Sequence, residues 1–309
     1  MDTKNVENAN FFQVDHRVEN ILEEKGTKVL ESKEAWEKFP WTRKYFGKKP
    51  KEGYFIWIKS QPKFSLSTCI AIFSKKINQN LKNLLLVEKG IRVEANVWCL
   101  TNVWCLTKGK FLCAKHLAKG KIILKEGAFL EYNHFHRWGK EDLVLPDYEF
   151  YLEKKAKLRY KYQNLFSPKK LEIKTKIHCQ KETSANLKII VSASNSEVKI
   201  KDSLFLEGKK SQGIVRLRLI GGKKSEIEAL SQILARNSGK GHLDCQGLLI
   251  DRKAKISLIP QLICENKEAQ LTHEASIGKI SEEELIYLRT RGLREKEAIE
   301  LVVSGFLKT

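Results

Sequence analysis

The sequence predicts a mainly β protein, built as a β-solenoid with α-helices at both ends. From about residue 54 to residue 279, short runs of alternating apolar and polar residues follow one another, separated by polar turns. The turns resemble one another, and helical patterns are confined to the segments before and after this region. Together these observations indicate stacked coils that bury a continuous core.

The turns share one pattern of a strand end, polar residues, a small or apolar residue, and renewed alternation. It occurs in LVEKGIRVEA, LKEGAFLEY, LEKKAKLRY, IDRKAKISL and CENKEAQLT. Ala128, Ala156 and Ala185 are 28 and 29 residues apart, and Ala254 and Ala269 are 15 apart. These near-multiples of one strand-plus-turn unit favour a solenoid, although a β-sandwich, also made of short strands, stays open.

Residues 1–53 are predicted to form an N-terminal helical segment. RVENILEEKG places Val18, Ile21 and Leu22 on one helical face and ends in Gly26. SKEAWEKFPWTRKYFG then carries aromatic residues around the helix-breaking Pro40. We expect the aromatic side chains to fix this segment onto the solenoid.

One anomaly lies inside the predicted solenoid. NVWCLT occurs twice without change, at 96–101 and at 102–107. An even-numbered insertion preserves which side chains of a strand face inward, so a strand can accept it. The repeat leaves open whether Cys99 or Cys105 holds the original position.

Residues 280–309 are predicted to form a C-terminal helical segment of two helices. Ser281 and Glu284 fit a capping box, and Gly292 suits the position after a helix end. The second helix, within REKEAIELVVSGF, presents an apolar stripe of Ala298, Leu301, Val302 and Phe306.

Composition excludes several classes of protein. Hydrophobic residues make up 42% and charged residues 30%, and no apolar run approaches the roughly 20 residues that span a bilayer. The first residues contain no apolar segment typical of a secretion signal, so we expect a cytoplasmic protein that does not enter a membrane. The seven cysteines, an odd number without a C-x-x-C pair, are expected to be reduced thiols.

The net charge of +20 raises nucleic acid as a partner, with steeply salt-dependent binding. However, the 57 Lys and Arg are interleaved with 37 Asp and Glu along most of the chain. That arrangement favours a solvated strand face, or an acidic protein partner, over nucleic acid. The sequence contains no G-x-x-x-x-G-K-[ST] phosphate loop, so any ATP hydrolysis is expected to come from a partner.

Residues 242–306 resemble the C-terminal part of the SufB/SufD family of iron–sulfur cluster assembly scaffolds. The resemblance rests on a strand-borne cysteine, HEA, KISEEELIYLRTRG and EAIELVVSGF. It weakens toward residue 85, and the first 80 residues match only in general helical character. It implies a right-handed parallel β-helix core over residues 54–279, a dimer formed through the C-terminal β-helix ends, and C-terminal helices that dock a SufC-like ABC ATPase.

The resemblance also implies a cluster site at the dimer interface. Cys245 matches the SufB cysteine regarded as a cluster or sulfur acceptor, Glu274 its acidic residue, and His273 a histidine kept in SufD-type chains. Because this chain has all three, a homodimer could supply what a SufB/SufD heterodimer supplies elsewhere. Thiolate sulfur is the ligand that iron–sulfur chemistry needs, and imidazole or carboxylate keeps a transient cluster labile enough to pass on.

A second set resembles the SufB route for sulfur into the β-helix. Cys105, Trp138 and Lys154 match its cysteine, tryptophan and lysine, whereas His136 stands where glutamine is expected. Cys264 is a possible spare ligand. The remaining cysteines Cys69, Cys113 and Cys179 are expected to be structural.

The function predicted on this basis is that of a non-catalytic scaffold for cluster assembly and transfer. One alternative is a SufD-like structural subunit without its own cluster. Another is a hexapeptide-type acyltransferase in which a histidine acts as general base, but the sequence lacks a sustained six-residue period. The sequence leaves open whether the dimer is a homodimer or a SufB/SufD-like heterodimer, which cluster type forms, and whether a flavin supplies electrons.

Overall fold

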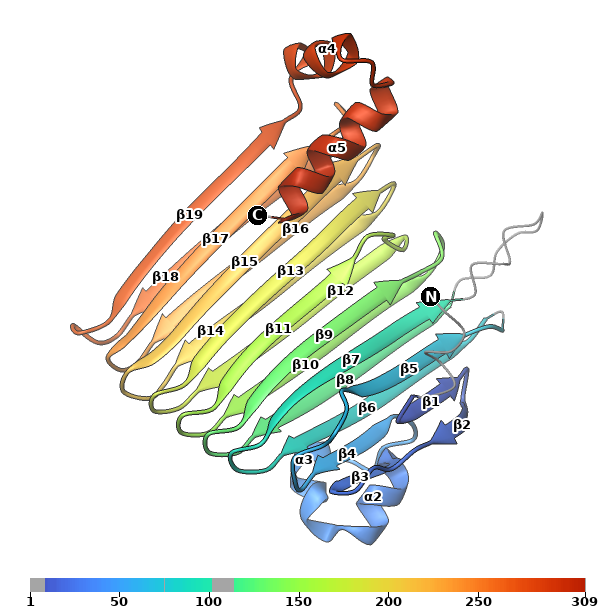
Figure 1. Ribbon diagram of the computed structural model, residues 1–309, viewed down its shortest axis with the longest axis vertical. Helices are drawn as coiled ribbons and strands as arrows, with labels where there is room; N and C mark the ends of the chain where they lie inside the picture. The colour runs from blue at the N-terminus through green and yellow to red at the C-terminus, as the bar shows by residue number, and fades with distance from the viewer. Residues whose placement is uncertain (1–8, 75, 102–113, 309) are drawn as a thin grey trace.

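The computed structural model describes residues 9–74, 76–101 and 114–308, and these form a β-solenoid of two facing sheets (Figure 1). From β4 onward, successive strands alternate between the sheets, and each pairs in parallel with the strand one coil away. The mainly β solenoid predicted from the sequence is therefore confirmed. No described helix is both long and apolar enough to cross a bilayer.

Sheet A has ten strands, in the spatial order β2 (Arg17–Ile21), β1 (Phe11–Val14), β5 (Leu66–Ile72), β7 (Arg92–Thr101), β9 (Phe129–Arg137), β11 (Lys157–Asn164), β13 (Ser184–Ser194), β15 (Ser211–Gly222), β17 (Gly239–Leu249) and β19 (Gln270–Lys279). Sheet B has nine: β3 (Thr27–Glu31), β4 (Tyr54–Ile58), β6 (Asn78–Val87), β8 (Lys115–Leu124), β10 (Leu143–Leu152), β12 (Lys170–Cys179), β14 (Glu197–Leu206), β16 (Glu226–Ala235) and β18 (Lys255–Cys264).

The core lies between the sheets and follows the period-two pattern. On β11 the inward residues Leu158, Tyr160 and Tyr162 are buried, while their neighbours are partly or fully exposed. In-register parallel pairing stacks like positions in rows, so each inward side chain packs on its counterparts in the adjacent coils. Each fully buried large apolar side chain contributes about 1.5–3 kcal/mol relative to an exposed one.

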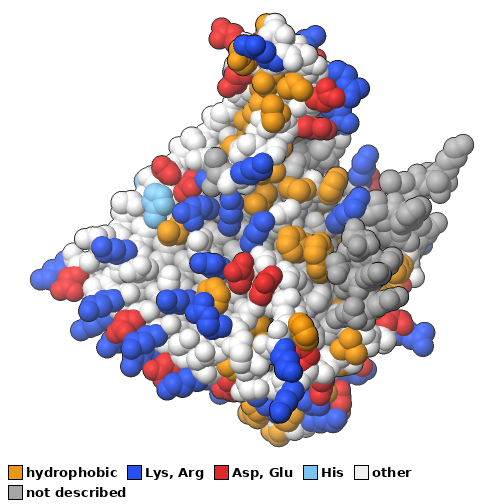
Figure 2. Space-filling model, viewed as in Figure 1, with side chains coloured by type: hydrophobic (Ala, Val, Ile, Leu, Met, Phe, Trp, Pro, Cys, Tyr) orange, Lys and Arg blue, Asp and Glu red, His pale blue; other side chains and the backbone are white. Residues whose placement is uncertain are grey.

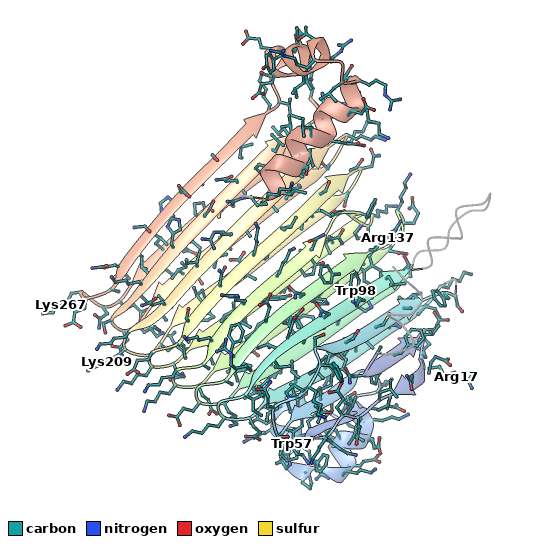
Figure 3. All side chains as sticks on the ribbon, viewed as in Figure 1. Arg17, Trp57, Trp98, Arg137, Lys209 and Lys267 are labelled. Atoms are coloured by element: carbon teal, nitrogen blue, oxygen red, sulfur yellow. The ribbon has the colours of Figure 1, made fainter. Side chains whose placement is uncertain are left out.

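The repeated turns also stack, which explains the pattern found in the sequence. Ala128, Ala156 and Ala185 are buried at the points where strands resume. Beside them, Gly127 and Lys155 adopt left-handed backbone conformations with φ of 69° and 61°. Lys267 and Lys209 lie at turns along one side of the solenoid (Figure 3).

The N-terminal segment is only partly helical. α2 (Ser32–Lys38), the 3-10 turn η1 (Pro40–Thr42) and α3 (Arg43–Phe46) lie where helices were expected. The helix expected at residues 17–26 is wrong, because Arg17–Ile21 forms strand β2. Edge pairing with β1 supplies the backbone hydrogen bonds and outweighs the local helical spacing. The aromatic residues do pack together, with the rings of Trp41 and Trp57 5.1 Å apart.

The C-terminal segment forms the two predicted helices, α4 (Glu282–Thr290) and α5 (Glu295–Lys308). Ser281 and Glu284 make the predicted capping box at the start of α4. Gly292, with φ of 92°, follows the end of that helix. α5 folds back and contacts β15 on the outer face of sheet A (Figure 1).

Candidate functional site

Cys245 lies on β17 and points into the core near the C-terminal end of the solenoid. Its side chain is 1% exposed, and it pairs with Leu217 of β15 and Ala275 of β19. Burial raises the pKa of the thiol to about 12, and the nearby Asp202 carboxylate raises it further, although a hydrogen bond with Ser231 opposes this. Cys245 is therefore a protonated thiol in this closed arrangement.

The neighbouring coil, β18 and β19, forms an open end of the solenoid. β18 pairs only with β16, and β19 only with β17, among the described strands. Their outer edges therefore expose backbone N–H and C=O groups that can pair with another strand. Ile259 and Ile277 on these strands are each 45% exposed.

His273 faces the inner side of this open end. It pairs in register with Leu243, which is fully buried, and Leu271, two residues earlier, packs against the core. His273 thus lies on the same face of sheet A as Cys245, one strand away and two residues back along the strand. Strand spacing puts the two Cα atoms about 8 Å apart.

Glu274 faces the opposite, outer side of sheet A. Its carboxylate lies 3.7 Å from His242 Nε2, and His242 Nδ1 is 2.8 Å from Thr272 Oγ1. Within one chain, Cys245 and His273 therefore lie on the inner face of sheet A, whereas Glu274 lies on its outer face. A ligand set of all three requires groups from a second chain or a local rearrangement of β19.

A buried polar pair near Cys245 was missed by the sequence reasoning. Asp202 on β14 and Ser231 on β16 are inward-facing neighbours in sheet B, and the Ser231 hydroxyl donates to Asp202 Oδ1 at 2.8 Å. Burial raises the pKa of Asp202 to about 7. The signal in the sequence was that Asp202 and Ser231 both occupy inward positions in strands with an alternating apolar–polar pattern.

The second predicted set is only partly brought together. His136 and Trp138 are buried neighbours, and the Trp138 indole N–H donates to His136 Nδ1 at 3.0 Å. Lys154 lies at an exposed turn, 3.8 Å from Glu126. It is separated from His136 by roughly the length of β9, about 30 Å. Cys105 lies outside the described residues, so its part in a sulfur route stays a prediction.

The first copy of the repeated hexapeptide lies beside these residues. Cys99 of β7 pairs in register with His136 of β9, and Val97 pairs with His134. Burial lowers the pKa of His134 to about 3, with a smaller contribution from His116. In the sequence, Cys99 is recognisable only as one copy of the repeat, and the signal for His134 is HFHRW, which places both histidines on one strand face.

The other cysteines occupy different environments. Cys69 and Cys179 are buried free thiols. Cys264 is exposed at the end of β18, with its thiol 3.2 Å from the Asn266 carbonyl oxygen. Cys113 lies outside the described residues.

The terminal helices carry exposed apolar side chains. Ile286, Tyr287 and Leu301 are each more than half exposed, and hydrophobic side chains are visible on the helical end of the molecule in Figure 2. A groove of about 590 Å³ lies between α4 and α5, and its walls include Ile286, Leu293 and the basic Arg289 and Arg294. The groove thus combines apolar and basic side chains with the acidic Glu295.

These features define a β-solenoid protein whose terminal coil has outer edges without a described partner strand, with a buried thiol nearby and projecting helices. The family model described as SUF system FeS cluster assembly, SufBD core domain, matches residues 116–306. The chain belongs to this SufB/SufD family, whose role is iron–sulfur cluster assembly.

Known relatives agree with this assignment. A SufBD family protein of Archaeoglobus fulgidus is 27% identical over 92% of this chain and 79% of its own length. A SufBD family protein of Methanothermobacter thermautotrophicus is 27% identical over 82% of this chain, and SufB of Bacillus subtilis is 26% identical over 83%. This chain spans 62% of the Methanothermobacter protein and 55% of the Bacillus protein.

Proposed function

We propose that this chain is a non-catalytic scaffold subunit that assembles and transfers iron–sulfur clusters as a homodimer. The observation that carries the proposal is the open end. Cys245 and His273 share the inner face of adjacent strands there, and no described strand pairs with the outer edges of β18 and β19. A second copy paired edge to edge would bring its own His273 and Glu274 to the same interface.

The chemistry of the three side chains supports cluster handling. A thiolate from Cys245 provides the soft ligand for iron, and imidazole or carboxylate completes the shell. The closed solenoid keeps the thiol protonated, because burial raises its pKa to about 12. The proposal therefore includes a displacement of β19 or β18 that exposes Cys245 to the cluster components.

We further propose that a SufC-like ABC ATPase docks on α4 and α5 and drives this displacement. α4 follows directly from β19 and α5 follows α4, so movement of the helices can be transmitted to the open end. Ile286, Tyr287 and Leu301 provide exposed apolar contacts. Tyr287→Ala combined with Leu301→Ala should abolish copurification with the coexpressed ATPase while leaving the far-UV circular dichroism unchanged; undiminished copurification would contradict the docking surface.

The cluster proposal is tested by coexpression with the ABC ATPase of the same genome, followed by anaerobic reconstitution with iron and sulfide. Thiolate-to-iron charge-transfer absorption is expected in the wild type and in Cys179→Ser, which removes another buried thiol. Cys245→Ser should keep the complex but lose the absorption. Full cluster content in that variant would refute the ligand assignment, and a colourless wild-type complex would indicate a SufD-like structural subunit.

A further inference from the structure

A cluster of one cysteine and two histidines lies inside the solenoid, away from the open end. Cys99 on β7 and His134 and His136 on β9 are buried, and their potential ligand atoms all lie within 4.8 Å of one another. Cys99 Sγ is 3.6 Å from His134 Nε2, and the Nε2 atoms of the two histidines are 2.8 Å apart. In-register pairing of β7 and β9 fixes this geometry, since Cys99 lies opposite His136.

Hydrogen bonds define where the ring protons lie in the metal-free cluster. An indole N–H can only donate, so His136 Nδ1 accepts from Trp138, at 3.0 Å, and carries no proton. The proton of neutral His136 is then on Nε2, which donates to His134 Nε2 at 2.8 Å. His134 consequently carries its own proton on Nδ1, 3.3 Å from the Tyr160 hydroxyl.

We propose that Cys99, His134 and His136 bind a borderline divalent transition-metal ion, of the Zn²⁺ or Fe²⁺ class, through one thiolate and two imidazoles. Tetrahedral coordination with ordinary metal–ligand lengths requires a sulfur–nitrogen separation of about 3.6 Å and a nitrogen–nitrogen separation of about 3.4 Å. The first matches the observed distance of 3.6 Å between Cys99 and His134. The second requires the two rings to separate by about 0.5 Å from 2.8 Å.

Metal binding replaces two protons at the ligand atoms. The Cys99 thiol releases its proton to solvent, and the His136 Nε2 proton is replaced by one on Nδ1, where the Tyr162 hydroxyl oxygen, 3.0 Å away, can accept it. The Trp138 indole N–H then loses its acceptor. The thiolate offsets one of the two positive charges, and a fourth ligand would have to come from an exogenous anion or water.

This site would be independent of cluster assembly at the open end, so its test uses metal content and spectroscopy. Protein is produced with Co²⁺ in the growth medium, purified anaerobically and compared by metal analysis and absorption spectroscopy. Co²⁺ is expected at one equivalent, with thiolate charge-transfer and tetrahedral ligand-field bands that Zn²⁺ displaces. Cys105→Ser and Cys179→Ser are the matched cysteine controls and should retain both the bound Co²⁺ and its absorption bands.

The double variant Cys99→Ser/Cys105→Ser should lose the charge-transfer bands, and it prevents the second copy of the repeat from substituting for the first. His136→Gln, which supplies an amide in place of the ring, should reduce occupancy at least tenfold. Trp138→Phe should tighten Co²⁺ binding several-fold, because it removes the donor that competes for His136 Nδ1. Bands that persist in the double cysteine variant, or a wild-type protein without Co²⁺, would refute the site.

Discussion

Arg218 of β15 and Asp244 of β17 form a bidentate ion pair on the outer face of sheet A, with nitrogen–oxygen distances of 2.8 and 2.7 Å. Both side chains are almost completely buried. α5 contacts β15 on this face, and the neighbouring outward residues Ile220 and Leu248 are also buried. The ion pair thus lies in the region where the terminal helix returns to the solenoid, one residue before Cys245.

Breaking this ion pair should destabilise the C-terminal coils. Asp244→Ala leaves a buried guanidinium without its carboxylate, which typically costs about 3–5 kcal/mol. The change is measured by urea unfolding followed by circular dichroism. Arg252→Ala removes an ion pair with Glu282 whose side chains are 93% and 81% exposed, so it serves as the control with little expected change. Equal effects of the two substitutions would contradict this account.

Stability should fall as pH rises because of Asp202. Its pKa is raised from 3.8 to about 7, so the folded state favours the protonated carboxyl. The contribution of protonated Asp202 to the free energy of unfolding is fully present below pH 3.8 and is lost as pH rises through about 7. For a pKa shift of this size it amounts to roughly 4 kcal/mol.

Asp202→Asn places an amide beside Ser231, and this side chain cannot ionise. Unfolding free energies measured from pH 5 to pH 8 should therefore decline less in the variant than in the wild type. The Cys245 thiol, whose pKa the Asp202 carboxylate raises, stays protonated across this range. Identical pH slopes for the two proteins would exclude Asp202 as the source.

Self-association should depend on the open end. Ile277→Glu places a carboxylate among the inward-facing residues of β19, where Ile277 is 45% exposed, and desolvating that charge in an interface is costly. Light scattering should show a dimer for the wild type and a monomer for the variant. Phe166→Glu is the control: Phe166 is 58% exposed but does not lie on β18 or β19, so this variant should remain dimeric.

Close packing inside the solenoid makes Gly120 sensitive to substitution. A Cβ at this position of β8 would clash with the ring of Tyr148 on β10, whereas a Cβ at Gly278 of β19 would meet open space. Gly120→Ala should destabilise the protein by about 1–3 kcal/mol, because the fully buried ring must shift. Gly278→Ala should have a much smaller effect on the urea midpoint.

The sequence by itself determined the alternating strands, their recurring turns and most of the terminal helices. Period-two alternation and recurring turns define local strand geometry, while Ser281 and Glu284 define the start of α4 through contacts three residues apart. These signals are short-range, so they can be read without knowing what packs against them. The same reasoning failed at Arg17–Ile21, where pairing with β1 outweighed a helical spacing.

Only the tertiary structure decided which side chains meet. Cys99, His134 and His136 come together because β7 and β9 are in register although 35 residues separate Cys99 from His134. The family resemblance assigned His273 and Glu274 to one site, but consecutive strand residues point to opposite faces. The spacing of residues along the chain determines the strands, and the register between coils determines the sites.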